Sequence, residues 1–398
     1  MKYRNLLFIF LLSVFASCSK DPELEPDTPP STFKVRIDNV IHETYFDSYP
    51  QGPSLFVPYL VMSGLPEGEK LLAFGGYYSP ENPNPDGSDY TFIHDCADDE
   101  LIQGWDWTQE LIYSAGWIDL PIPGKTYYFK GVVRTNKAVY YSNTVTINTD
   151  GLPGYTPGPQ DRVLPVVFHV MPRKDGTYPH PYFFDEMLAC ANRLYRNVWP
   201  LPGLADAGIR FVPATHAPDG TALSTPGIHY LDERYELDLD ISNEELRQWV
   251  GDNLWEMTEV INVWVSPFIN DHIVSEDTST AGFTFLPYFA PEEMLQGCNT
   301  AVPGCFSGIF LNQEIVGNGY CNSGIAVFAH EAGHYLGLDH VFEEDWCDDT
   351  PQYDRARYRT EQYIPGIDTY LRYPIDASAE PYTALNVMDY DIVIYSGI

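Results

Sequence analysis

The chain has 398 residues, of which 44% are hydrophobic and 20% charged, a composition typical of folded globular domains. Acidic residues number 56 and basic residues 22, which gives a formal charge of −34. This charge repels phosphate backbones and anionic lipid head groups, so the composition excludes nucleic acid as a partner and an anionic membrane surface as a docking site.

The first residues predict an export signal. Lys2 and Arg4 precede an apolar run over residues 6–15, which is too short to span a bilayer and is typical of a signal peptide. The run leads into the letters FASC, which resemble a bacterial lipobox, so we expect residues 1–17 to be removed and Cys18 to be lipidated. A plain signal peptide cleaved nearby is the alternative. We expect an exported lipoprotein of the outer membrane or cell surface that is attached to the membrane by its N-terminal lipid only. A location on the periplasmic side of the outer membrane is the alternative.

Two proline-rich stretches divide the rest of the chain. Residues 18–31 are acidic and lack apolar periodicity, which predicts a flexible tether. Residues 151–160 (GLPGYTPGPQ) predict a linker. We therefore expect one domain over residues 32–150 and a second over residues 161–398.

The first domain is predicted to be all-β. Its short alternating segments are separated by Gly, Pro, Asn and Asp. The clearest pair, residues 127–136 and 139–149, predicts a hairpin with a short polar turn. This hairpin resembles the last two strands of a fibronectin type III or immunoglobulin-like domain, which implies a β-sandwich. The domain shows no catalytic grouping, so we expect it to be a structural spacer.

The second domain begins with a continuous apolar run at residues 163–171, which predicts a strand covered on both faces. His169 lies in this run and is predicted to be a packed structural residue. The elements that follow alternate between helix and strand: helix 183–199, strand 209–212, helix 242–258 and strand 261–265. This alternation implies an α/β fold with a mixed sheet.

The motif HEAGHYLGLDH begins at His330. His330 and His334 are spaced by one helical turn, so both imidazoles can reach one cation. Gly337 can take the left-handed conformation that ends a helix and returns the chain, which brings His340 round as a third ligand. Three imidazoles suit zinc and leave a fourth position for water. Glu331, one position round the helix, is placed beside the metal as a general base.

The helix that carries the motif has its own signals. Asn322 or Ser323 can cap its start. An apolar stripe at helical spacing comprises Ile325, Phe328, Ala329, Ala332 and Leu336. This stripe predicts that the histidines lie on the opposite face, towards a cleft.

The letters NVMDY at residues 386–390 resemble the Met-turn of the metzincin zinc peptidases. The resemblance implies that Met388 lies beneath the metal as a hydrophobic floor. It also implies that Tyr390 hydrogen-bonds the oxyanion of the substrate. Together with the histidine motif, this segment implies a metzincin (zincin) catalytic domain.

Within the metzincins the chain resembles the pappalysin (cytophagalysin) family. The resemblance rests on LGLDHVF, WCDDTP, NVMDY and the INVWV strand, and it spans roughly residues 163–390. It implies zinc endopeptidase activity. It also implies structural Ca²⁺ near an acidic cluster that includes Asp348 and Asp349, for which a solvated acidic loop is the alternative.

Six cysteines follow Cys18, an even number that indicates disulfide bonds in an exported chain. Four of them crowd around the motif: Cys298, Cys305, Cys321 and Cys347. Cys298 and Cys305 could close a small loop, but the sequence leaves the pairing open. Cys190 lies in an apolar helical stretch, where we predict a buried thiol.

Taken together, the motifs predict a zinc endopeptidase that hydrolyses peptide bonds of extracellular proteins. We expect a monomer, although the sequence leaves the oligomeric state open. We expect its protein or peptide substrate to lie along an edge strand, for which residues 307–315 are the candidate. The alternative is a surface adhesin, a binding lipoprotein whose protease domain is inactive. The complete set of histidines with Glu331 favours the enzyme.

Overall fold

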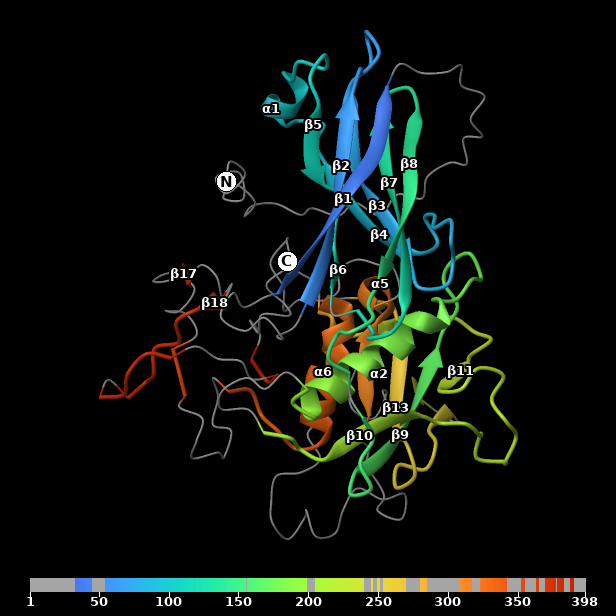
Figure 1. Cartoon of the computed structure of the whole chain (residues 1–398). Helices are drawn as coiled ribbons and strands as arrows, with labels where there is room; N and C mark the ends of the chain where they lie inside the picture. The colour runs from blue at the N-terminus through green and yellow to red at the C-terminus, as the bar shows by residue number, and fades with distance from the viewer. Residues whose placement is uncertain are drawn as a thin grey trace.

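The computed structural model is mostly β, with few helices (Figure 1). It describes residues 33–44, 54–119, 121–154, 156–198, 205–239, 245, 249–250, 253–269, 280–284, 308–316, 323–341, 352–354, 363–364, 369–376, 378–382 and 387–389. The expected signal peptide, the tether and Cys18 lie outside these ranges. Within them, no helix has the length and apolar character that a membrane crossing requires.

The N-terminal part folds into two antiparallel sheets. One has the order β1-β2-β5 with β6 also paired to β2, and comprises β1 Lys34–Thr44, β2 Ser54–Ser63, β5 Leu111–Ser114 and β6 Ile118–Asp119. The other has the order β4-β3-β7-β8 and comprises β3 Leu71–Ser79, β4 Tyr90–Asp95, β7 Thr126–Thr135 and β8 Val139–Asn148. A short helix, α1 Glu100–Gln103, begins at its cap residue Asp99. The all-β prediction and the hairpin, β7–β8, are confirmed.

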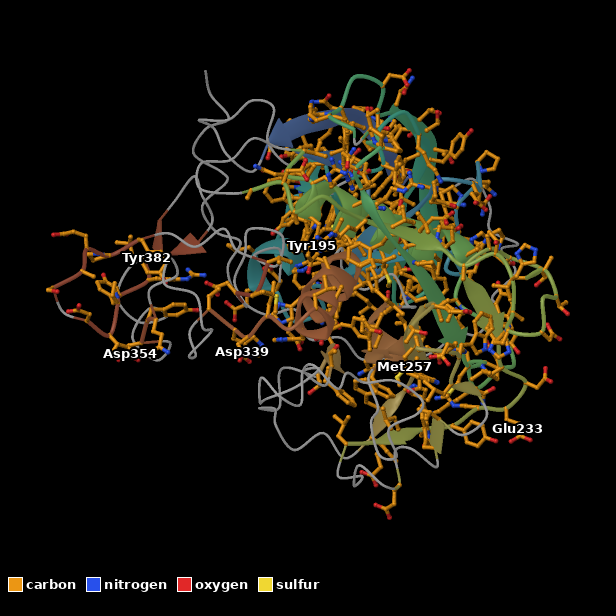
Figure 2. The ribbon with its side chains drawn as sticks, turned by 90° about the horizontal axis from the view of Figure 1, so that it is seen from below. Tyr195, Glu233, Met257, Asp339, Asp354 and Tyr382 are labelled. Atoms are coloured by element: carbon orange, nitrogen blue, oxygen red, sulfur yellow. The ribbon has the colours of Figure 1, made fainter. Side chains whose placement is uncertain are left out.

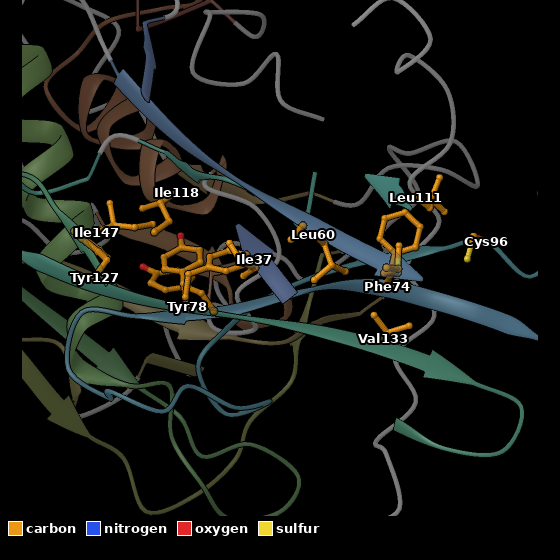
Figure 3. Packing of buried hydrophobic residues seen from close by; sticks show 14 of the residues in the cluster. Ile37, Leu60, Phe74, Tyr78, Cys96, Leu111, Ile118, Tyr127, Val133 and Ile147 are labelled. Carbon is orange, nitrogen blue, oxygen red and sulfur yellow. The ribbon is translucent and has the colours of Figure 1, made fainter. Parts of the chain in front are cut away.

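Side chains from both sheets share one apolar core (Figure 3). Leu60 of β2 is 0% exposed and Phe74 of β3 is 1% exposed, and they lie on facing sheets. Phe129 of β7 fills the space above Gly76, where a Cβ atom would lie 2.2 Å from the ring. Because buried residues of two facing sheets share one core, this part of the chain is a sandwich.

The C-terminal part is built on one mixed sheet of order β10-β9-β13-β16-β15, with β11 also paired to β9. All pairings are parallel except that of β15 with β16. Its strands are β9 Arg162–Val170, β10 Ile209–Pro213, β11 Ile228–Tyr230, β13 Ile261–Ser266, β15 Gly282–Thr284 and β16 Ile309–Asn312. The predicted mixed α/β sheet is confirmed.

Two helices cover one face of this sheet, α2 Pro181–Tyr195 and α6 Ser323–Tyr335 (Figure 1). Val263 of β13 packs against them, whereas its neighbour Trp264 packs against Phe310 on the other face. The continuous apolar strands are therefore buried on both sides. The helices also touch each other, since the Tyr195 hydroxyl donates to the carbonyl oxygen of Ala329 at 3.0 Å.

The smaller elements lie around this layer. They are β12 Leu237–Asp238, β14 Phe268–Ile269, α5 Gln313–Val316, β17 Tyr363–Ile364 and β18 Thr369–Tyr370. About half of the predicted helix 242–258 lies outside the described residues, and within the described half residues 245, 249 and 250 are helical. The last part of the predicted helix is not helical: residues 254–258 are irregular or lie in a turn.

The prediction that residues 307–315 form an edge strand was wrong. Within the described sheet β16 lies between β13 and β15, and all four of its residues are buried. The outermost strand is β15, whose residues are half-buried. An apolar pattern shows that a strand is buried, but the order of strands depends on pairings that the pattern does not contain.

The sandwich is packed directly against α2. Glu186 of α2 is 4% exposed and accepts hydrogen bonds from two tyrosines of the sandwich, Tyr127 at 2.7 Å and Tyr90. Arg193, also on α2, donates to the carbonyl oxygen of Pro121 at 2.9 Å. Burial raises the pKa of Glu186, and the two tyrosine hydrogen bonds act against that rise. The spacer predicted from sequence is therefore a docked part of the molecule, one helix away from α6.

Replacing Tyr127 with Phe tests this docking. The change keeps the buried ring but removes the hydroxyl that donates to Glu186 and accepts from the backbone N–H of Ile122 at 2.8 Å. Because the buried Glu186 carboxylate and the half-buried backbone N–H of Ile122 each lose a hydrogen bond, we expect the free energy of unfolding to fall by about 1–3 kcal/mol. Urea denaturation followed by tryptophan fluorescence measures it.

Tyr128→Phe is the matched control, because this neighbour on β7 is half-buried and its hydroxyl makes no hydrogen bond among the described residues. We expect it to change stability by less than about 0.5 kcal/mol. Equal effects of the two substitutions would show that the Glu186 contact does not hold the sandwich in place.

Candidate metal centre

His330 and His334 lie one turn apart on α6, and the helix ends directly after them. Gly337 has φ +96°, its N–H donates to the carbonyl oxygen of His334 at 2.9 Å, and the N–H of Leu338 donates to that of Gly333 at 3.0 Å. This pair of bonds is the Schellman arrangement, which requires a left-handed residue and therefore favours glycine. The expected turn at Gly337 is present, and the chain returns along residues 338–340.

The sequence predicted that the histidines lie towards a cleft, but in the structure the two helical histidines are buried. His330 is 6% exposed and His334 is 8% exposed, so both rings are buried. Leu336, which the sequence placed in the buried stripe, lies just past the end of α6 and is 38% exposed. The stripe ends early because the helix stops at Tyr335, and residues 387–389 pack against the side that carries the histidines.

The three imidazoles converge on one point. The Nε2 atom of His340 lies 3.3 Å from that of His330 and 3.1 Å from that of His334. Nitrogen ligands at about 2.0–2.1 Å from a tetrahedral zinc ion would be about 3.3–3.4 Å apart. Within the described ranges these are the residues whose ligand atoms gather closely enough, within 4.8 Å, to hold a metal. The geometry fits a zinc ion with three imidazole ligands.

Backbone carbonyls determine which nitrogen of each ring carries the proton. The Nδ1 of His330 lies 2.7 Å from the carbonyl oxygen of Val387, and that of His334 lies 2.7 Å from the carbonyl oxygen of Leu338. A carbonyl oxygen only accepts, so each Nδ1 donates and each Nε2 keeps a lone pair. Burial, with the neighbouring His334, lowers the pKa of His330 to about 3. That ring is therefore neutral and ready to bind a cation at neutral pH.

Glu331 lies beside the histidines and under the outer strand of the sheet. It is 5% exposed, and its Oε2 accepts a hydrogen bond from the hydroxyl of Thr284 on β15 at 2.9 Å. The strand runs close to this residue, because a Cβ atom on Gly282 would lie 3.1 Å from Cγ of Glu331. Burial raises the pKa of Glu331 to about 8, while the Thr284 hydrogen bond lowers it. A nearby divalent cation would favour the ionised carboxylate.

Met388 packs into a notch of α6 between the two helical histidines. The methionine is 1% exposed, and a Cβ atom on Gly333 would lie only 2.2 Å from its sulfur. Any side chain larger than that of glycine at position 333 would displace the methionine. Val387 and Met388 thus contact α6 on the side that carries His330 and His334.

Several predicted residues fall outside the described ranges. They are Tyr390, Asp348, Asp349 and the cysteines Cys298, Cys305, Cys321 and Cys347. Nothing in the described part of the chain supports a calcium site. Nor does that part contain a disulfide bond: Cys96 is a buried free cysteine, and Cys190 is buried in α2 as predicted.

His169 is fully buried, as predicted, but its partner was not foreseen. Its Nε2 lies 3.0 Å from Oδ1 of Asn262 and its Nδ1 lies 2.9 Å from Nδ1 of His229. Burial lowers the pKa of His169 to about 3. The pair is a packed polar contact of the sheet, away from α6.

Two further residues at the site, Thr284 and Asp389, gave little or no signal in the sequence. Thr284, which contacts Glu331, gave no signal, because a lone threonine in a short strand has no pattern of its own. Asp389 gave a weak one, since a charged residue beside the buried Met388 needs a partner. That partner, Arg372, follows from tertiary structure alone.

The comparisons with known proteins bear on this part of the chain. The sequence model of the peptidase family described as pregnancy-associated plasma protein-A matches residues 244–395. No curated protein matches the chain. Among solved structures, the chain is similar to a mutant of promirolysin from Tannerella forsythia, with 18% identity and a TM-score of 0.38, covering 62% of this chain and 83% of that one. It is also similar to a DUF3823 family protein from Bacteroides ovatus, with 15% identity and a TM-score of 0.21, covering 29% of this chain and 55% of that one.

The matched residues 244–395 contain α6, the returning His340 and the segment 387–389 that packs against them. The site therefore lies in the part of the chain that matches this metalloprotease family, which supports the resemblance to the pappalysins seen in the sequence.

Proposed function

We propose that the chain is a zinc-dependent endopeptidase of the metzincin type, with His330, His334 and His340 as the metal ligands and Glu331 as the general base. What carries the proposal is the convergence of three Nε2 atoms at the end of α6, two of which are held as lone-pair donors by backbone carbonyls. Three protein ligands leave the fourth zinc position to water or substrate. An adhesin with an inactive protease domain has no need for this complete set.

Each of these residues has a separate role in the proposed reaction. A zinc ion bound by the three imidazoles would lower the pKa of a water molecule to about 7 and polarise the scissile carbonyl. Glu331 takes the proton of the attacking water and passes it to the leaving amine. Thr284 holds the Glu331 carboxylate in place during both transfers. Tyr390, from its position in NVMDY, is proposed to hydrogen-bond the developing oxyanion.

The substrate is proposed to bind along β15 in place of the residues 307–315 first expected. β15 is the outermost strand of the described sheet, and its last residue, Thr284, contacts Glu331. An extended peptide that pairs with this edge would lie beside the general base. Main-chain pairing binds many sequences alike, which suits an endopeptidase of extracellular proteins.

We further infer that the N-terminal sandwich is an immunoglobulin-like or fibronectin type III-like domain over residues 32–150, joined to a catalytic domain over 161–398. The strand orders β1-β2-β5 and β4-β3-β7-β8, with one shared core, support this inference. Export and lipid attachment at Cys18 are proposed from the sequence of residues 1–31.

The substitution Glu331→Gln tests the role of the general base. Gln keeps the size of the side chain but cannot take a proton, and Glu331 is not one of the three ligands. We expect about one zinc per chain to be retained and casein cleavage to fall by roughly 10²–10⁴-fold. Metal content by mass spectrometry and cleavage of fluorescent casein measure the two quantities.

A chelator provides the control for this experiment. Removing zinc from the wild-type chain should abolish cleavage, and adding zinc back should restore it; the variant should stay inactive in both states. Full activity of Glu331→Gln would end the assignment of the base.

Thr284→Val tests the positioning of the base. Valine keeps the branched shape that suits β15 but lacks the hydroxyl. A hydrogen bond to a charged group contributes about 1.5 kcal/mol, so we expect kcat to fall about tenfold with zinc content unchanged. Thr284→Ser, which restores the hydroxyl, should recover most of the loss. A valine variant with the kcat of the wild type would contradict the role given to Thr284.

A further inference from the structure

A fully buried ion pair lies beside the metal centre and takes no part in the proposed chemistry. Arg372 and Asp389 are both 0% exposed, and Nε of Arg372 donates to Oδ2 of Asp389 at 3.0 Å. The hydroxyl of Tyr353, 1% exposed, donates to the other oxygen at 2.9 Å. The guanidinium also lies 5.5 Å from the centre of the Tyr353 ring. Both carboxylate oxygens of Asp389 are thus bound by side chains.

Such a pair does little for stability. Removing two charges from water costs as much as their attraction returns, and apolar residues of the same size often stabilise a fold as well. A buried ion pair with both oxygens bound does restrict geometry, because few arrangements satisfy all the partners at once. The segment that Asp389 holds therefore has a fixed position.

That segment contacts the metal centre with three consecutive residues. The carbonyl oxygen of Val387 accepts the hydrogen bond from Nδ1 of His330 at 2.7 Å. Met388 fills the notch at Gly333. Asp389 is bound by Arg372 and Tyr353. Val387 lies two residues before Asp389 in the chain. A shift of Asp389 would therefore also move the Val387 carbonyl, which is the acceptor that orients the His330 ring.

The two side chains that hold Asp389 come from a small lobe with its own backbone pairing. Arg372 and Tyr382 exchange backbone hydrogen bonds of 2.7 and 3.0 Å, and the N–H of Asp354 donates to the carbonyl oxygen of Tyr373 at 3.0 Å. In Figure 2, Asp354 and Tyr382 are on the same side of the view, which is also the side towards which Asp339 lies from α6. From this lobe Arg372 reaches Asp389, which follows Val387 and Met388 in the chain.

We propose that Arg372 and Tyr353 are positioning residues for the metal site: through Asp389 they hold the Val387 carbonyl against His330 and so fix the orientation of that ligand. The proposal rests on the proposed zinc function, and it adds residues that no family motif in the sequence contains. Partners of metal-bound imidazoles set the tautomer and the ring orientation, and their loss typically weakens metal binding about 10–100-fold.

The test measures zinc affinity in the full chain by competition with a chromophoric chelator. We expect Arg372→Met to weaken zinc binding about 10–100-fold and Tyr353→Phe, which removes one hydroxyl, to weaken it about tenfold. Cobalt substituted for zinc should give an altered visible absorption spectrum in both variants, because that spectrum depends on ligand geometry. Arg36→Met is the matched control, since it removes an Arg pair with Asp38 and Glu110 in the sandwich and should change neither reading.

Wild-type zinc affinity together with an unchanged cobalt spectrum in the folded variants would overturn the proposal. If Arg372→Met does not fold, Tyr353→Phe decides by the same two readings. A wild-type chain that binds no zinc would overturn the proposed function as well, whereas zinc binding that both variants leave unchanged would overturn the positioning role alone.

Discussion

Two backbone carbonyls determine the chemistry of this site, because they decide which nitrogen of each helical histidine is protonated. Leu338 provides one within the turn that ends α6, and Val387 provides the other from a residue 57 positions beyond His330. With Nδ1 donating to a carbonyl, each Nε2 keeps the lone pair that a cation needs. If either acceptor moved, the corresponding ring could turn or carry its proton on the wrong nitrogen.

The rest of the structure keeps α6 and these two carbonyl acceptors in fixed positions relative to each other. The sandwich packs on α2 through Glu186, and α2 packs on α6 through Tyr195. On another side β15 lies against Glu331 at Gly282 and Thr284. Contacts from segments far apart in sequence therefore surround one short helix, and its histidines are buried as a result.

Local features could be predicted from the sequence and long-range contacts could not. The spacing of His330, His334 and Gly337 specifies one helical turn and a left-handed end, and these depend only on neighbouring residues. The hairpin β7–β8 and the buried strand β9 are local in the same way. The interior position of β16 depends on pairings with two strands distant in the chain. The contact of Thr284 with Glu331 joins residues 47 positions apart, and no period or motif encodes it.

The coordination of zinc in the full chain tests the central claim most directly. X-ray absorption at the zinc edge should detect about four light ligands at about 2.0–2.1 Å, with the multiple-scattering signal of three imidazoles. A shell of sulfur at about 2.3 Å, or the signal of a fourth imidazole, would contradict the account, because either would close the position that the substrate and its water must share.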